Sequence, residues 1–148
     1  MKLVSKKTFR ASPTELWQII HDPANMQVWN PKCIRCEKLD GPDNRGAFLV
    51  TYDFNGKQSD ARGTVVKMEP NREIRFRYEY EDSARLGVVE ESFLIETKGW
   101  RQTRLKHTVD FSHSTLPRWV KWFIGIVGRF GKSVGNGPLE EIEKLLPE

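Results

Sequence analysis

Two short turns constrain how the middle of this chain folds, because they set the register of its strands. Residues 32–113 read almost entirely as strand, and "FNGK" places Asn55 and Gly56 in a two-residue type I′ hairpin turn. The turn predicts that Phe54 pairs with Lys57, Tyr52 with Ser59, Val50 with Ala61, and Phe48 with Gly63. An antiparallel hairpin is therefore expected here.

A second turn, "EPNR", predicts a four-residue loop between the next two strands. It predicts that Met68 pairs with Glu73, Val65 with Phe76, Gly63 with Tyr78, and Ala61 with Tyr80. The two turns agree on one inward face, made of Phe48, Val50, Tyr52, Phe54, Ser59, Ala61, Gly63, Val65, Ile74, Phe76, Tyr78 and Tyr80. The opposite face is mostly polar, as in an antiparallel sheet with one face in water.

Helix-start signals lie between the first strand and the hairpins. Ser12 is a predicted N-cap, Pro13 takes the first helical position and Glu15 the capping-box position. An Asp-Pro pair at residues 22–23 repeats the same device. The sequence therefore predicts two short helices in succession, and the second ends near Trp29 because a proline follows soon after.

The remaining strands are expected at residues 2–10, 86–97 and 100–111, with the last two turning at Lys98 and Gly99. The carboxyl end is predicted to be helical from about residue 116. An apolar face is expected from Leu116, Trp119, Val120, Phe123, Ile126, Val127, Phe130 and Val134, opposite Arg118, Lys121, Arg129 and Lys132. Pro138 is expected to kink or restart the helix.

The totals indicate one globular domain over residues 1–148, with a net charge of +4. The charge is too modest and too dispersed to favour nucleic acid as a partner. No apolar run is long enough to span a bilayer and the first residues lack the apolar core of a signal peptide, so a cytoplasmic location is expected.

Cysteines and histidines are few. Cys33 and Cys36 form a C-x-x-C spacing, but on a regular strand residues three apart point to opposite faces, so we expect two reduced thiols. His21, His107 and His113 lack metal-ligand spacing. No metal and no cofactor are predicted.

The element order and the segment "FRASPTELWQIIHDPANMQVWNP" resemble the START-like (SRPBCC) superfamily, closest to its polyketide cyclase/dehydratase-like branch. The matching positions are Ala11, Ser12, Pro13, Glu15, Trp17, Asp22, Trp29 and Pro31. The resemblance implies an α+β helix-grip fold (START/Bet v 1-like), in which a curved antiparallel sheet of about six to seven strands wraps round a long C-terminal helix. It also implies a cavity between sheet and helix for apolar or aromatic ligands.

Several residues are candidates for that site. The predicted ligand-binding residues are Trp29, Phe48, Val50, Tyr52, Ala61, Gly63, Phe76, Tyr78, Tyr80, His107, Trp119, Phe123 and Val127. His107 should face inward, and one register of the last hairpin puts Glu90 beside it while the other puts Glu91 there. Such a pair is a candidate general acid and base, or a satisfied buried ion pair. Trp29 is a candidate gate at the cavity mouth, or a plain core aromatic residue.

Three functions follow as hypotheses. The first is a non-enzymatic carrier of a hydrophobic or aromatic small molecule such as a lipid, isoprenoid or polyketide-like compound. The second is a cyclase or dehydratase using His107 with Glu90 or Glu91. The third is an interaction module acting through Trp119, Trp122 and the basic face of the last helix, including transient contact with a membrane surface. The oligomeric state is left open.

Overall fold

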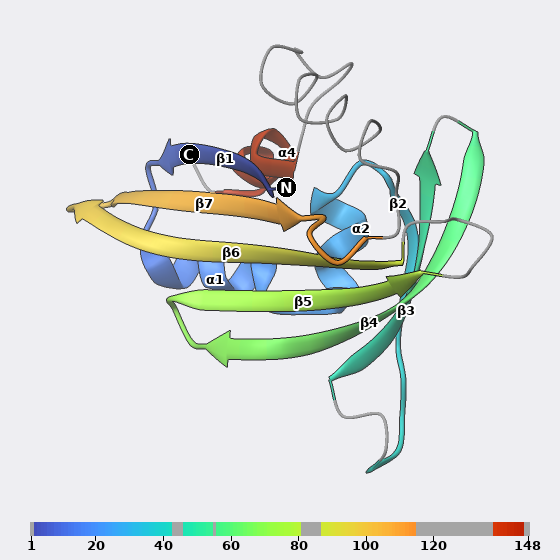
Figure 1. The fold of residues 1–148 in the computed structure, drawn as a ribbon. Coiled ribbons are helices and arrows are strands. Elements are labelled where there is room, and N and C mark those ends of the chain that lie inside the picture. The colour runs from blue at the N-terminus through green and yellow to red at the C-terminus, as the bar shows by residue number, and fades with distance from the viewer. Residues whose placement is uncertain (1, 43–45, 55, 81–86, 115–137, 147–148) are drawn as a thin grey trace.

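Seven strands form one curved antiparallel sheet in the order β1-β7-β6-β5-β4-β3-β2 (Figure 1). The computed structural model describes residues 2–42, 46–54, 56–80, 87–114 and 138–146. The strands are β1 (Lys2–Phe9), β2 (Cys33–Lys38), β3 (Ala47–Phe54), β4 (Lys57–Glu69), β5 (Glu73–Tyr80), β6 (Val88–Gly99) and β7 (Gln102–Asp110). The helical elements are α1 (Pro13–Ile20), the 3-10 turn η1 (Pro23–Asn25), α2 (Met26–Trp29) and α4 (Pro138–Leu145).

The register predicted from the Asn-Gly turn is confirmed. Strands β3 and β4 pair Phe54 with Lys57, Tyr52 with Ser59, Val50 with Ala61 and Phe48 with Gly63. The inward face is confirmed as well, since its large side chains Phe48, Phe76 and Tyr78 are buried. The alternation of apolar and polar residues therefore decided which face of the sheet meets the core.

The register next to the second turn is corrected by a β-bulge. Val65 pairs with Phe76 as predicted, but Met68 pairs with Ile74 instead of Glu73. The shift lies between Val65 and Lys67, where β4 carries an extra residue. The loop is accordingly shorter than predicted and has Asn71 in the left-handed region with a φ of 62°, a conformation that asparagine tolerates.

The last hairpin also turns later than predicted. Gly99 still pairs with Gln102, so Trp100 and Arg101 form the turn in place of Lys98 and Gly99. Arg101 has a φ of 51°, and its guanidinium Nη1 lies 3.0 Å from the Glu15 Oε1 of α1. This contact between distant parts of the chain stabilises a turn that local sequence signals did not reveal.

Both predicted helix starts are confirmed. The Ser12 hydroxyl accepts a hydrogen bond from the Glu15 amide at 3.2 Å, and the Glu15 carboxylate accepts one from the Ser12 amide at 3.3 Å. Asp22 caps η1 by accepting from the amide of Ala24 at 3.0 Å. The chain therefore makes two capped turns in succession before entering β2, and the helical segment ends at Trp29 as predicted.

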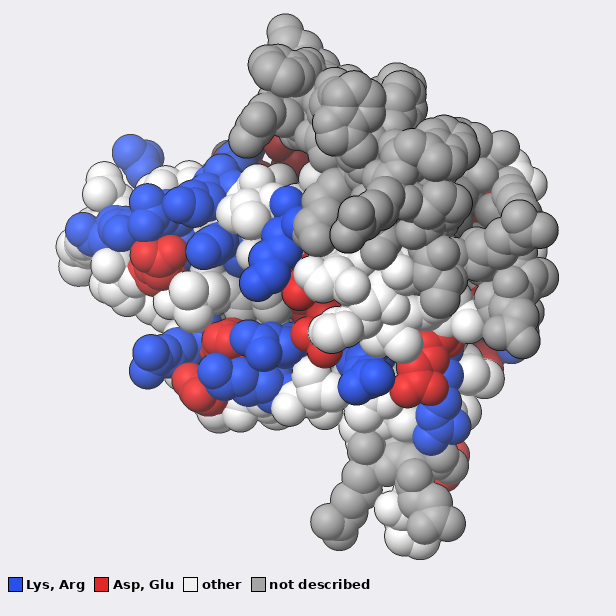
Figure 2. Space-filling view, in the orientation of Figure 1, with Lys and Arg blue, Asp and Glu red and all other residues white. Residues whose placement is uncertain are grey.

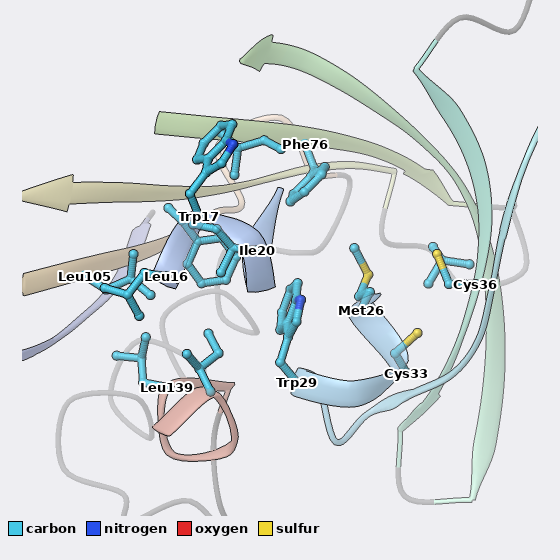
Figure 3. Packing of buried hydrophobic residues seen from close by; sticks show 14 of the residues in the cluster. Leu16, Trp17, Ile20, Met26, Trp29, Cys33, Cys36, Phe76, Leu105 and Leu139 are labelled. Atoms are coloured by element: carbon cyan, nitrogen blue, oxygen red, sulfur yellow. The ribbon is translucent and has the colours of Figure 1, made fainter. Parts of the chain in front are cut away.

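Helices α1, α2 and α4 lie against the inward face of the sheet and share one core with it (Figure 1). Figure 3 shows Leu16, Ile20, Trp29 and Met26 of the first helices pointing toward the sheet, with Leu139 of α4 beside Leu16. The elements of the amino and carboxyl ends of the chain thus meet in the same core.

Strand β2 departs from the regular alternation predicted for it. A register shift between Cys33 and Arg35 leaves Ile34 as an extra residue, and both cysteines are buried on the same side of the strand. The expectation that they point to opposite faces is therefore wrong. Both thiols are free.

Helix α4 runs over Pro138–Leu145 and buries Leu139 and Ile142, so the helical turn predicted from Pro138 is present; whether the chain kinks or restarts there depends on residues outside the described ranges. The long helix predicted from residue 116, with Trp119, Phe123 and Val127 on its apolar face, lies outside the described residues. In the described part of the chain, no helix is both long and apolar enough to cross a membrane.

Candidate functional site

A chain of hydrogen-bonded polar side chains crosses the inward face of the sheet. The Tyr78 hydroxyl donates to Glu91 Oε1 at 2.7 Å. The other carboxylate oxygen, Oε2, lies 2.7 Å from His107 Nε2. Both oxygens of one buried carboxylate are therefore bonded to groups that come from the neighbouring strands.

Strand alternation explains why these three side chains meet. Tyr78 of β5 pairs with Val89 of β6, and Glu91 lies two residues further on the same face. His107 of β7 pairs with Phe93, which again lies two residues beyond Glu91. Glu91 is thus the diagonal neighbour of a residue on each side, within reach of long side chains.

Apolar rings surround this polar chain. Glu91 is 5% exposed and His107 7% exposed. Phe93 stacks on the imidazole of His107 with ring centroids 4.6 Å apart, and Trp29 meets Phe93 edge-on at 5.1 Å. A carboxylate in such surroundings depends on its hydrogen bonds, because burial away from water is costly for a charge.

The tyrosines extend the polar chain toward α2. The Tyr52 hydroxyl donates to the Met26 sulfur at 3.2 Å, and the rings of Tyr52 and Tyr78 meet edge-on with centroids 5.9 Å apart. Tyr80 lies beside both rings, at 6.2 and 6.5 Å. The inward face therefore presents a row of phenols that ends in the Glu91–His107 pair.

Burial raises the pKa of Tyr52 and of Tyr78 well above the usual value, and the nearby Glu91 carboxylate adds to the effect. The pKa of Tyr80 moves in the same direction for the same two reasons. All three phenols consequently stay protonated at neutral pH. They are hydrogen-bond donors in this site and not bases.

The structure decides between the two glutamates left open by the sequence. Glu91 faces His107, whereas Glu90 pairs with Asp110 and lies on the outer face of the sheet. There Glu90 shares a shallow polar depression with Lys2, Arg75 and Asp110. The inward alternation expected for His107 is confirmed by its burial, and Glu90 is no longer its candidate partner.

Trp29 is fully buried in the core. Its indole N–H has no hydrogen-bond partner among the described residues. The side chain packs on Phe93, and its assignment as a gate stays a prediction.

The other predicted lining residues in the described ranges lie on the inward face, but they differ in the space that they leave. Val50, Ala61 and Phe76 are buried. The ring of Phe48 covers Gly63 so closely that a methyl group there would lie 2.2 Å from its Cζ atom. Small and large residues therefore interdigitate at this position. Trp119, Phe123 and Val127 lie outside the described residues.

Met26 and Phe93 belong to the site although the sequence analysis did not single them out. Met26 lies three residues before Trp29, so helical spacing places both on one side of α2. Phe93 continues the alternation of Glu91 toward Ile95. Once Trp29 and Glu91 are taken as site residues, the helical and strand spacings in the sequence therefore indicate Met26 and Phe93. Within the described ranges, no group of three or more His, Cys, Asp or Glu side chains is arranged to hold a metal ion.

Comparison with solved structures identifies the same fold in distant proteins. A START superfamily protein from Mycobacterium smegmatis superimposes with a TM-score of 0.73 at 20% identity, covering 97% of this chain and 95% of that one. The ginseng major latex-like protein 151 from Panax ginseng gives a TM-score of 0.69 at 14% identity, covering 99% and 98%. A protein from Thermus thermophilus gives 0.69 at 14% identity, covering 97% and 95%.

Among curated proteins, none matches this sequence. A family model described as "Polyketide cyclase / dehydrase and lipid transport" matches residues 1–137. This match covers nearly the whole chain, and it agrees with the curved sheet and with the START-like neighbours. The chain therefore belongs to the polyketide cyclase/dehydrase and lipid transport family, and it has the fold of the START superfamily protein.

Proposed function

We propose that the protein binds a hydrophobic or aromatic small molecule on the inward face of its sheet, and that Tyr78, Glu91 and His107 orient the polar end of that ligand. The family includes lipid transport in its description, which supports binding of an apolar molecule. The observation that carries the proposal is the buried hydrogen-bonded chain of these three residues.

The chain of polar residues is hard to explain by stability alone. Replacing a buried ion pair by well-packed apolar residues is often neutral or stabilising, so a fold does not need such a pair to be stable. Here a carboxylate and an imidazole lie among Phe93, Trp29 and Tyr78. A role in binding explains their presence, because they can form hydrogen bonds with the one polar group of a ligand that is otherwise apolar.

One nitrogen atom of these hydrogen-bonded side chains remains available for the polar group of the ligand. His107 uses Nε2 toward Glu91, and its Nδ1 makes no hydrogen bond with the described residues. Because Glu91 already accepts on both oxygens, this second nitrogen of His107 is the atom that we assign to the ligand. A hydroxyl or enol at the end of an aromatic or isoprenoid body matches this arrangement, because a neutral imidazole that donates from Nε2 to Glu91 accepts a hydrogen bond at Nδ1.

Native mass spectrometry of the protein from its own source tests the proposal, followed by denaturation to identify a released molecule. A stoichiometric apolar ligand is the expected result. His107→Ala and Tyr78→Phe should weaken its binding, whereas Ser92→Ala, which lies on the outer face between Glu91 and Phe93, should not. A clean unliganded mass, together with no uptake from a library of lipids and aromatic compounds, would refute the proposal.

The Glu91–His107 contact favours a second candidate, a cyclase or dehydratase. At 2.7 Å, Glu91 is placed to stabilise the imidazolium that forms when His107 acts as a base. In a dehydration, His107 would remove a proton next to a carbonyl and return it to the departing hydroxyl, which leaves as water. The two candidates differ in one readout: His107→Ala abolishes turnover of a polyketide-like substrate in the enzyme and only weakens binding in the carrier.

The third hypothesis, an interaction module built on Trp119, Trp122 and the basic helix face, concerns residues outside the described part of the chain. Charge reversal at Lys121 and Arg129 tests it. Those substitutions should weaken contact with a membrane or protein partner and should leave small-molecule binding unchanged.

A further inference from the structure

Trp100 is the most exposed large apolar side chain among the described residues. It is 89% exposed at the tip of the β6–β7 hairpin, whereas the other exposed large hydrophobic residues range from 41% to 55%. A tryptophan buries more apolar area than almost any other side chain when it finds a partner. Leaving it in water at a hairpin tip therefore points to a partner outside the fold.

The tip is held in place and does not rest on local turn propensity. Arg101, the residue after Trp100, forms an ion pair with Glu15 of α1 at 3.0 Å. On either side of the turn, Lys98 and Arg104 both contact Glu96. These contacts connect the base of the hairpin to α1 and β6 to β7, and Trp100 projects beyond them.

A basic area on the outer face of the sheet leads to this tip. Figure 2 shows Lys and Arg side chains gathered along β1 and β7. Lys6 and Arg10 are exposed and Lys106 is half-buried, and none of the three forms an ion pair with a described residue. In contrast, the carboxylates near the tip, Glu15 and Glu96, are already paired with basic residues.

Lys6 and Lys106 face each other directly across the β1–β7 ladder. Like charges in this position destabilise a sheet. A lysine on an edge strand such as β1 also protects against strand-to-strand aggregation, but β7 is an interior strand between β1 and β6. The protective role therefore does not explain Lys106, while an external anionic partner would relieve the repulsion between the two lysines.

We propose that this surface, made of Trp100, Arg10, Lys6 and Lys106, docks on the anionic headgroups of a phospholipid bilayer. Tryptophan prefers the boundary between headgroups and acyl chains, and lysine or arginine beside it interacts with anionic lipid. A single exposed tryptophan beside dispersed basic residues suits a bilayer better than an acidic protein surface. The indole of Trp100 can insert into the fluid headgroup region without a preformed pocket, which a protein partner would have to supply. The proposal does not depend on Tyr78, Glu91 and His107, which lie on the opposite face of the sheet.

Flotation with vesicles tests the proposal with the intact protein. Wild type is expected to float with vesicles of phosphatidylcholine and phosphatidylserine, to stay behind with phosphatidylcholine alone, and to lose binding as salt is raised. Trp100→Ala and Lys106→Glu should each weaken the apparent affinity, the latter roughly tenfold or more because it reverses a charge near the surface. Lys106→Glu should not lower Tm, because it replaces the repulsion from Lys6 with an attraction.

Matched controls lie away from the tip. Lys32→Glu makes the same change of charge at an exposed site just before β2, and Leu49→Ala on the outer face of β3 removes an apolar side chain that is 46% exposed. Both should float like wild type.

The proposal is overturned if wild type does not float with anionic vesicles, or if Trp100→Ala and Lys106→Glu float like wild type. It is also overturned if only Lys121→Glu with Arg129→Glu removes flotation, which would assign membrane contact to the carboxyl-terminal segment. If the wild-type protein is retained on an acidic polypeptide but does not float with vesicles, the bilayer proposal is overturned and the partner is an acidic protein.

Discussion

The phenyl ring of Phe48 occupies the space that a side chain at Gly63 would need, since a Cβ there would lie 2.2 Å from Cζ and 2.3 Å from Cε2. The two residues pair across β3 and β4 on the inward face. The glycine is thus required by the aromatic ring above it and not by the backbone of the strand.

Gly63→Ala should therefore destabilise the protein by about 1–3 kcal/mol, the usual cost of overpacking a core. Urea unfolding measures the change. Phe48→Leu is expected to relieve the clash, so the double variant should lose less stability than the sum of the two single variants. Additive losses would show that the destabilisation by Gly63→Ala does not come from the contact with the Phe48 ring.

Removing one member of the Glu91–His107 pair should be expensive. His107→Leu leaves a buried carboxylate with only Tyr78 as a partner, and we expect a loss of about 3–5 kcal/mol in the free energy of unfolding. Replacing Glu91 by Leu in the same protein should recover much of that loss, because no buried charge then remains. If the double variant were as unstable as His107→Leu alone, the loss would not come from an unpaired buried charge at Glu91.

The tyrosines offer a spectroscopic test of burial. The protein has 3 tyrosines, and all lie on the inward face with their pKa raised above the usual value of 10.0 by burial. Ultraviolet titration should therefore show no phenolate step near pH 10 while the protein is folded. The step should coincide with loss of circular dichroism at higher pH. A normal titration of one phenol in the folded protein would contradict the burial of that residue.

Alkaline pH should also act through the cysteines. Burial raises the pKa of Cys33 to about 11 and of Cys36 to about 12, from an ordinary value of 9.0. Groups with a raised pKa in the folded state contribute their stability below the unfolded value, and that contribution is lost as pH rises from about 9 toward 12. Cys33→Ala/Cys36→Ala should show a weaker alkaline decline than wild type when both are unfolded by urea under reducing conditions.

The cap of α1 is a further check. Ser12→Ala removes the acceptor for the Glu15 amide and should cost about 0.5–2 kcal/mol in the free energy of unfolding. Ser12→Asp keeps an acceptor and should retain most of the stability. An equal loss in both variants would indicate that the hydroxyl itself, and not the cap, is needed.

The sequence was informative wherever a local pattern dominates. The Asn-Gly turn and the alternation from Phe48 to Tyr80 predicted the pairing of β3, β4 and β5 as far as the bulge, and Ser12 and Asp22 predicted the helix starts. These features depend on backbone geometry that a few residues determine. The inward position of His107 followed from the same alternation.

The rest depended on contacts between distant segments. The bulges at Ile34 and Val66 insert one residue each, and no alternation pattern reveals an insertion before the partner strand is known. The turn at Trp100 and Arg101 depends on Glu15, far away in the sequence. For the same reason the sequence could not decide whether Glu90 or Glu91 faces His107. That choice requires the position of the β6–β7 turn, since a shift of one residue exchanges the two faces of the strand.

The pairing of β1 with β7 has a consequence for how the chain folds as it is made. In the described part of the chain β1 pairs with no other strand, so this first strand emerges from the ribosome well before its partner, whose last residue is Asp110. The hairpins from β3 to β7 form between neighbours and can close during synthesis. Residues 2–9 can pair only after β7 has been synthesised. Until then, the lysines among them disfavour aggregation of the unpaired strand.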